Sequence, residues 1–335
     1  MLSWLVWFPL KLLRWALCLV GVLALALTAM ISTPLAHPPE LRSISETARA
    51  VDRSTLPRLE RFSARDGTEL AYRHYPARSQ PTGRVAILVH GSSGSSTAVH
   101  ALADALAARG VETYAPDMRG HGASGTRGDV VYVGQLEDDL ADLVALVRKT
   151  SPSEPLTLLG HSAGGGFVLR VASSPIQNLF ARTVLLSPFL GYDAATSRPD
   201  AGGWASADVP RILGLMALRK LGTDCCEALP VLAFAVPPNS EKMLVATYTE
   251  RLRRNFAASA DFHRDLAAVT KPMTVFAGAD DELMLADKYA EAVNGAAVPV
   301  DVKLIAGVNH MGIVSAAKAV SAIADDVATR GMAGS

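Results

Sequence analysis

The segment GHSAG at residues 160–164 has the residue types and spacing of a nucleophilic serine turn. It follows the apolar run PLTLLG and precedes a helix-like run that begins at Ala163. A turn this sharp between a strand and a helix leaves no room for side chains at its two glycines, and it exposes the serine hydroxyl at the carboxyl end of the strand. The pattern predicts Ser162 as a nucleophile and the amide of Ala163 as a donor to an oxyanion. The alternative is a glycine-rich packing turn.

A serine hydroxyl is a weak nucleophile and needs a base, most often histidine. In enzymes with this turn, the acid follows the serine in the chain and the histidine comes last. Only two of the eight histidines follow Ser162, namely His263 and His310. His310 lies in the loop GVNHMG after the last predicted strand, whereas His263 precedes the strand that should carry the acid. His310 is therefore the predicted base.

The acid should follow the predicted strand PMTVFAG at residues 272–278, where Asp280, Asp281 and Glu282 occur in sequence. Its role is to fix the imidazole tautomer and to stabilise the imidazolium. Spacing alone does not separate the two aspartates. The small-residue loop HGSSGS at residues 90–95 follows another apolar run, and its backbone N–H groups could hold an oxyanion.

Strands and helices alternate from about residue 58, which predicts a mostly parallel sheet with helices on both faces. From Pro188 to about Arg264 the alternation stops, and the chain is punctuated by Pro and Gly with no clear strand. This pattern predicts a helical cap at residues 188–264, inserted into a core made of residues 58–187 and 265–335.

The run from Trp15 to Ile31 carries no charge, is apolar on every face and is long enough to cross a membrane. Residues 1–33 are predicted to be a membrane anchor or a signal sequence, and residues 34–57 a linker rich in Pro, Ser and charged residues. An anchor is favoured, because the run is longer than the apolar part of a signal peptide. Lys11 and Arg14 before the run favour a cytoplasmic N-terminus, whereas Arg42, Arg49 and Arg53 after it favour the reverse. The charges nearest the run decide most, so an extracytoplasmic catalytic domain is expected. The alternative is secretion after signal cleavage.

Composition limits the other classes of function. Lys plus Arg and Asp plus Glu both total 32, so a nucleic-acid partner is not expected. The densest basic run, Arg251, Arg253 and Arg254, is interpreted as a solvated helix face. Three cysteines at positions 18, 225 and 226 give neither a disulfide framework nor a zinc spacing. No cofactor or metal is predicted.

The motifs HGSSGSS, DMRGHGASG, GHSAGG, GADDEL and GVNHMG occur in the order found in the α/β-hydrolase superfamily. The loop DMRGHGAS resembles the subgroup of monoacylglycerol lipases, lysophospholipases and serine aminopeptidases, and the resemblance covers residues 58–330. It implies the α/β-hydrolase fold. The family's acid lies three residues after the glycine that ends its strand, here Gly278, so the resemblance selects Asp281. The family's first oxyanion donor maps onto Ser92.

These features predict a serine hydrolase that cleaves carboxylic esters through an acyl-enzyme, as a lipase, lysophospholipase or esterase does. The substrate would be a small-molecule or lipid ester. One alternative is an aminopeptidase-like amide hydrolase, which needs a cap carboxylate to hold the substrate amine; the candidates are Asp208, Asp224, Glu227, Glu241 and Glu250. The other is a non-catalytic binding module, but such a module would lack a triad member or the oxyanion loop.

Overall fold

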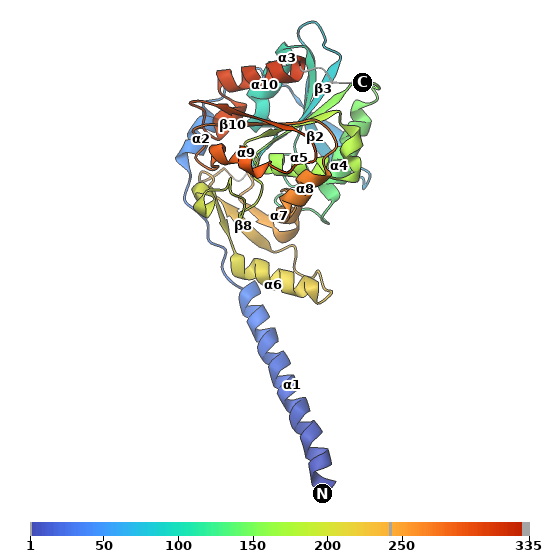
Figure 1. Ribbon diagram of the computed structural model, residues 1–335, viewed down its shortest axis with the longest axis vertical. Coiled ribbons are helices and arrows are strands. Elements are labelled where there is room, and N and C mark those ends of the chain that lie inside the picture. The colour runs from blue at the N-terminus through green and yellow to red at the C-terminus, as the bar shows by residue number, and fades with distance from the viewer. Residues whose placement is uncertain (1, 241–242, 330–335) are drawn as a thin grey trace.

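The computed structural model describes residues 2–240 and 243–329, and it has a rounded head from which one long helix projects (Figure 1). That helix is α1 (Leu2–Ile31). Residues 241–242 of the predicted cap, which include Glu241, and residues 330–335 of the predicted core lie outside the described part of the chain.

The head is built on an eight-stranded sheet with the order β1-β2-β4-β3-β5-β6-β10-β11. β2 runs antiparallel to both of its neighbours, β1 and β4, and the pairs from β4 to β11 are parallel. The predicted mostly parallel sheet is confirmed. The strands are β1 (Leu59–Ser63), β2 (Glu69–Tyr75), β3 (Arg84–Val89), β4 (Val111–Pro116), β5 (Leu156–His161), β6 (Arg182–Leu186), β10 (Met273–Gly278) and β11 (Val300–Ile305).

Helices cover both faces of this sheet, and alternate residues of one strand pack against the two layers. Val85, Ile87 and Val89 of β3 belong to the core cluster that contains α4 and α5, whereas Ala86 and Leu88 belong to the cluster that contains α3 and α10. Such two-sided burial explains the continuous apolar run of this strand. These helices are α3 (His100–Ala108), α4 (Gln135–Val147), α5 (Ala163–Ala172) and α10 (Ala317–Thr329).

The insertion between β6 and β10 differs from the predicted purely helical cap, because it contains three short strands. They form an antiparallel sheet with the order β7-β8-β9. β7 and β9 have only three residues each, too few to show a sequence period. The elements of the insertion and of the return to the core are β7 (Ala205–Ala207), α6 (Val209–Lys220), β8 (Pro230–Phe234), β9 (Thr247–Thr249), α7 (Glu250–Asn255), α8 (Phe262–Ala268) and α9 (Tyr289–Ala292).

The segment predicted as a linker also contains secondary structure, the helix α2 (Arg42–Arg49). Ile44 of α2 is only 6% exposed and belongs to the core cluster. The backbone N–H of Leu41, just before α2, donates to the carbonyl of Ala235 at 3.1 Å. This part of the chain is therefore packed on the head and does not form a free stalk.

The last turn of α1 contacts the cap helix α6. The Arg211 side chain donates to the carbonyl of Ile31 at 2.8 Å and also to the carbonyl of Thr33. The Thr33 hydroxyl donates to Asp208 Oδ1 at 2.7 Å. Among the described helices, only Leu10–Ile31 is long and apolar enough to cross a membrane, and a signal sequence would pass the same test.

Candidate active site

Ser162 lies between the end of β5 and the start of α5, with φ 54° and ψ −120°. This positive φ is rare for a residue with a side chain. A Cβ on Gly160 would lie 2.2 Å from the carbonyl oxygen of Gly164, and one on Gly164 would lie 2.2 Å from that of His90. Both glycines are therefore required by close backbone contacts, which explains the GHSAG pattern.

Backbone hydrogen bonds hold the serine turn against the neighbouring strand β6. The N–H of Ser162 donates to the carbonyl of Leu186 at 2.9 Å, and its own carbonyl accepts from the N–H groups of Gly166 and Phe189 at 3.1 and 2.9 Å. Such bonds let a strained backbone persist. The side chain of Ser162 faces a cavity that His310 also lines.

His310 and Asp281 form a buried pair on the loops after β11 and β10. His310 Nδ1 lies 2.8 Å from Asp281 Oδ2 and 3.0 Å from Oδ1. Asp281 Oδ1 also accepts from the backbone N–H groups of Leu283 and Met284 at 2.9 and 2.8 Å. Asp280, by contrast, is exposed. The loop geometry thus directs Asp281, and not its neighbour, to the imidazole.

The electrostatics of the pair follow from burial and mutual attraction. Burial disfavours the imidazolium, but the charge and hydrogen bond of Asp281 outweigh it and raise the pKa of His310. Burial likewise disfavours the carboxylate of Asp281, but His310 and two backbone donors lower its pKa overall. Since Nδ1–H donates to Asp281, Nε2 of neutral His310 is left to accept a proton. Among the described residues, no hydrogen bond yet joins Ser162 Oγ to His310, and such bonds often tighten only around a substrate.

A second buried histidine, His161, lies beside the pair without sharing its chemistry. Burial and the nearby charge of His310 lower the pKa of His161 to about 3. Its Nε2–H donates to the carbonyl of His310 at 3.2 Å. A neutral His161 therefore supports the His310 loop through its backbone.

The backbone N–H groups of Ser92 and Ala163 have no hydrogen-bond acceptor within the described part of the chain. The two residues line the same cavity as Ser162. A Cβ on Gly91 would lie 3.2 Å from Ser162 Cβ, so the loop approaches the serine closely. Free N–H groups beside a nucleophile are the arrangement that can hold an oxyanion.

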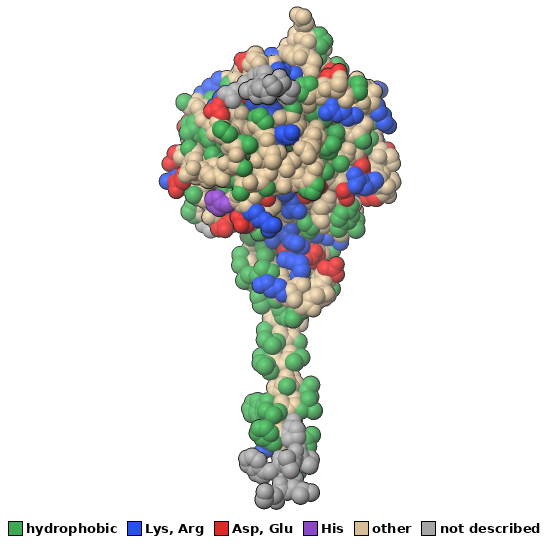
Figure 2. Space-filling view, turned by 45° about the vertical axis from the view of Figure 1, so that its right-hand side comes forward, with side chains coloured by type: hydrophobic (Ala, Val, Ile, Leu, Met, Phe, Trp, Pro, Cys, Tyr) green, Lys and Arg blue, Asp and Glu red, His purple; other side chains and the backbone are tan. Residues whose placement is uncertain are grey.

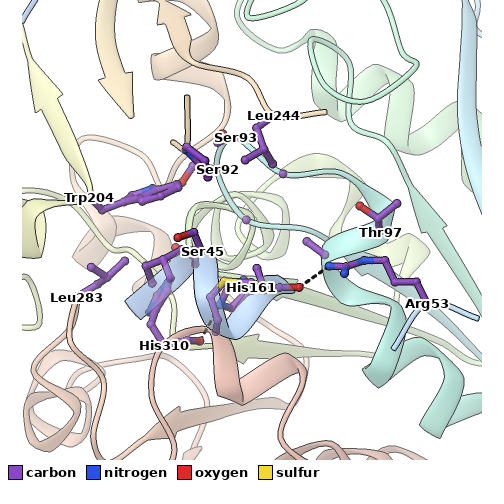
Figure 3. A pocket seen from close by; sticks show the side chains of 18 residues that line it. Ser45, Arg53, Ser92, Ser93, Thr97, His161, Trp204, Leu244, Leu283 and His310 are labelled. Atoms are coloured by element: carbon purple, nitrogen blue, oxygen red, sulfur yellow. Dashed lines mark hydrogen bonds between the residues drawn. The ribbon is translucent and has the colours of Figure 1, made fainter. Parts of the chain in front are cut away.

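Two cap residues that sequence reasoning missed hold this loop in place. Trp204 Nε1–H donates to Ser92 Oγ at 2.9 Å, and Figure 3 shows the two side chains pointing toward each other. The N–H of Ser93 donates to the hydroxyl of Tyr248 at 2.8 Å, and that hydroxyl lies 2.5 Å from Nε2 of His121. Trp204 had one sequence signal, since it is the only tryptophan after residue 15.

The donor and the acceptor of each hydrogen bond among Ser93, Tyr248 and His121 can be assigned. Burial lowers the pKa of His121 well below its ordinary value, so the ring is neutral. Its Nδ1–H donates to the carbonyl of Arg119 at 3.2 Å, which leaves Nε2 as the acceptor of the Tyr248 O–H. The Tyr248 oxygen in turn accepts from Ser93 N–H. His121 of the DMRGHG loop thus holds a cap tyrosine, and the tyrosine holds the residue next to Ser92.

Two cavities meet at Ser162. The smaller one, about 110 Å³, is walled partly by Ile44, Ser45 and Ala48 of α2. The larger one, about 580 Å³, extends beneath the cap and has many apolar residues in its wall. Both are lined by four shared residues: Ser92, Ser162, Trp204 and Leu283. An ester bound at Ser162 would therefore have separate space for its acyl and alcohol parts.

Within the described residues, no group of three or more His, Cys, Asp or Glu side chains could hold a metal ion.

The chain is similar in sequence to known hydrolases. Residues 80–314 match the family described as serine aminopeptidase, S33. The chain is 27% identical over 232 residues to a monoacylglycerol lipase of Mycolicibacterium smegmatis, covering 67% of this chain and 79% of that protein. It is 32% identical over 156 residues to the monoglyceride lipase of Homo sapiens, covering 45% of this chain and 49% of that protein.

Solved structures share the fold at lower sequence identity. A soluble variant of the monoglyceride lipase from Saccharomyces cerevisiae, in complex with a substrate analogue, superposes with a TM-score of 0.61 at 19% identity, over 82% of this chain and 94% of that chain. The monoacylglycerol lipase of Paleococcus ferrophilus gives 0.57 at 17% identity, over 78% and 98%.

Proposed function

The chain belongs to the serine aminopeptidase S33 family of α/β-hydrolases, and we propose that it is a serine hydrolase that cleaves carboxylic esters of lipid type through an acyl-enzyme. One observation carries the proposal: Ser162, on a strained turn, lines one cavity with His310, which pairs with buried Asp281, and a second cavity with Ser92 and Ala163. The N–H groups of Ser92 and Ala163 have no acceptor among the described residues. Its relatives named as monoacylglycerol lipases support an ester substrate.

The proposed reaction has two halves, acylation of Ser162 and hydrolysis of the acyl-enzyme, and the same catalytic groups act in both. Ser162 Oγ attacks the ester carbonyl while His310 Nε2 takes its proton, and the N–H groups of Ser92 and Ala163 hold the oxyanion. Asp281 stabilises the imidazolium, which then protonates the leaving alcohol. In the second half, His310 deprotonates a water that attacks the acyl-enzyme. The imidazolium then returns this proton to Ser162 Oγ as the Ser162–acyl bond breaks and the carboxylic acid leaves.

The charges around the larger cavity favour an ester over the amine-bearing substrate of an aminopeptidase. Of the candidate cap carboxylates, Glu227 and Glu250 are ion-paired with arginines, and Asp208 is buried beside Arg211 and Thr33. Asp224 is exposed and does not line the cavity. The described lining has four arginines against one carboxylate. Guanidinium groups offer no partner to a substrate ammonium group.

The test is labelling by a fluorophosphonate probe together with hydrolysis of a panel of aryl esters, glycerides and aminoacyl amides. The wild-type protein should be labelled and should cleave esters faster than amides. Ser162→Ala should lose both labelling and hydrolysis without a change in Tm. Labelling that persists in Ser162→Ala would refute the assignment of the nucleophile.

We further propose that α1 stays attached and anchors the protein in a membrane, with the catalytic head on the extracytoplasmic side. Its support is the contact of Ile31 and Thr33 with Arg211 and Asp208, which cleavage near residue 36 would break. Buried Arg211 would then lose two of its acceptors. The mass of the mature protein and its distribution between membrane and soluble fractions test this proposal. A soluble protein that begins near His37 would refute it.

A further inference from the structure

Four arginines line one end of the larger cavity: Arg170 of α5, Arg219 of α6, and Arg253 and Arg254 of α7. The described lining holds a single carboxylate, that of Asp193. Figure 2 shows Lys and Arg side chains gathered where the head narrows toward α1. Arg253 and Arg254 were expected on a solvated helix face, but they lie on a cavity wall instead.

Three glutamates outside the lining hold these arginines in position. Arg170 Nε lies 2.6 Å from Glu137, and Arg253 Nε lies 2.8 Å from Glu250. Glu227 is shared, since the same oxygen lies 2.5 Å from Arg219 Nη1 and 3.0 Å from Arg254 Nη1. Glu250 also reaches a second arginine, since its Oε1 lies 3.7 Å from Arg219 Nη1. Three carboxylates thus serve four guanidinium groups, and Glu227 and Glu250 each contact two of them.

The shared glutamate leaves the same edge of two guanidinium groups unused. Arg219 and Arg254 both contact Glu227 through Nη1, and neither Nε–H nor Nη2–H of either residue has an acceptor in the described part of the chain. These two N–H groups lie on one edge of the planar guanidinium, the edge that binds a carboxylate or phosphate in bidentate fashion. Partial burial and, to a smaller extent, the charge of Arg219 lower the pKa of Arg254.

The position of this arginine end relative to Ser162 follows from α5. The helix begins directly after Ser162 and carries Arg170 eight residues later, so the two Cα atoms lie about 12 Å apart at 1.5 Å per residue. The cavity wall also includes Phe189, Met216 and Phe256, which are apolar. A bound molecule would place an ester at one end, apolar groups along the wall and a charged group at the other end.

We propose that the arginine end of the larger cavity binds an anionic group, a phosphate or a carboxylate, carried by the ester substrate. This inference rests on the proposed ester hydrolysis at Ser162. The anion would accept hydrogen bonds from the free edges of Arg219 and Arg254, while Glu227 holds their Nη1 atoms. The charge could belong to either part of the ester, as a phosphate on the alcohol or a carboxylate at the far end of the acyl chain.

The experiment uses the full-length protein in neutral detergent and two matched pairs of esters. One pair is 1-lauroylglycerol and its 3-phosphate, and the other is methyl laurate and the monomethyl ester of dodecanedioic acid. The kcat/KM of the charged member should exceed that of the neutral member by about tenfold in at least one pair, as expected for hydrogen bonds to a charged group. The pair that shows this preference identifies which part of the substrate carries the charge.

Variants test whether the arginines cause the preference. Arg219→Gln should lower the ratio of charged to neutral kcat/KM by about tenfold, because it removes a bidentate donor while Glu227 keeps Arg254. Arg219→Lys should restore only part of the ratio. Arg251→Gln is the matched control, since Arg251 is on the same helix as Arg254 but pairs with Asp129 and does not line the cavity. It should leave the ratio unchanged.

Calorimetric titration with hexyl phosphate and with neutral 1-O-hexylglycerol separates this inference from the proposed activity. Binding of hexyl phosphate that is lost in Arg219→Gln and retained in Arg251→Gln supports the anion site even if no ester is hydrolysed. A wild-type protein with no preference for either charged ester and no affinity for hexyl phosphate would overturn it. So would a preference that Arg219→Gln leaves intact.

Discussion

Replacing Tyr248 by Phe should damage catalysis although the hydrogen bonds of its hydroxyl go to Ser93 and His121 and not to Ser162 or His310. The substitution removes one oxygen that accepts from Ser93 N–H at 2.8 Å and donates to His121 Nε2 at 2.5 Å. Both partners are buried, at 1% exposure each. The ring itself remains and keeps its edge-to-face contacts with Phe234 and His121. The change therefore tests the hydroxyl alone.

The expected magnitude follows from what the hydroxyl holds. Each buried group left without a partner costs about 1–3 kcal/mol of unfolding free energy. Losing one oxyanion donor outright costs about 10²–10³ in kcat. Tyr248 positions the residue beside Ser92 and donates nothing to the oxyanion itself, so a smaller loss of about tenfold in kcat is expected, with KM nearly unchanged because the cavity walls stay in place.

Tyr75→Phe is the matched control for this prediction. Tyr75 is equally buried, and its hydroxyl lies 3.0 Å from Nδ1 of His100, but it belongs to the core cluster beneath α3 and α10. Both variants should lose similar stability in chemical denaturation. Only Tyr248→Phe should lose kcat and bind a boronic acid inhibitor, which mimics the tetrahedral intermediate, more weakly. Full kcat in Tyr248→Phe, or an equal loss in Tyr75→Phe, would refute the positioning role.

Further predictions concern the acid and the N-terminal segment. Asp281→Asn should lower kcat by about 10³–10⁴, and Asp280→Asn by about tenfold or less. His310 acts as a base only when neutral, so kcat/KM should rise with pH through the raised pKa of His310. Asp281→Asn removes the charge that raises this pKa. A pH profile of kcat/KM should therefore show the rise at lower pH in the variant. Deleting residues 1–36 should give a soluble, active protein with a lower Tm. Deleting residues 1–53 should also lower kcat/KM by about tenfold, because the α2 wall of the smaller cavity would no longer bind the substrate; this factor is equivalent to about 1.4 kcal/mol.

The parts of the site that the sequence predicted are those set by local backbone geometry. GHSAG could be recognised because two close backbone contacts require its glycines. The loops of His310 and of the acid could be placed because the carboxyl ends of neighbouring parallel strands meet at one edge of a sheet. The choice of Asp281 over Asp280 came from the family resemblance, and the structure brings Asp281 and His310 together. For the serine turn and for His310, the position within the chain was enough to indicate the position in space.

The parts that the sequence did not predict depend on packing between distant segments. Tyr248 is on a strand of three residues, which shows no period, and it meets a histidine more than a hundred positions earlier in the chain. Ile44 and Ser45 are in a segment whose Pro and charge content is typical of a linker, yet α2 packs into the core cluster through Ile44. Arg253 and Arg254 had the pattern of a solvated face, because nothing local shows that a cap covers them.

The cap helix α6 connects the last turn of α1 to the proposed anion site. Arg211, near its start, holds the end of α1, and Arg219, near its end, lines the cavity with a guanidinium edge that has no acceptor among the described residues. Eight residues of helix separate them by about 12 Å, so α6 acts as one rigid segment between the two positions. Arg219 and Arg254 contact the same Glu227 oxygen, and Arg219 keeps this place only while α6 stays in position. Arg211→Ala, which releases α6 from α1, should therefore weaken hexyl phosphate binding even though Arg211 lies outside the cavity lining.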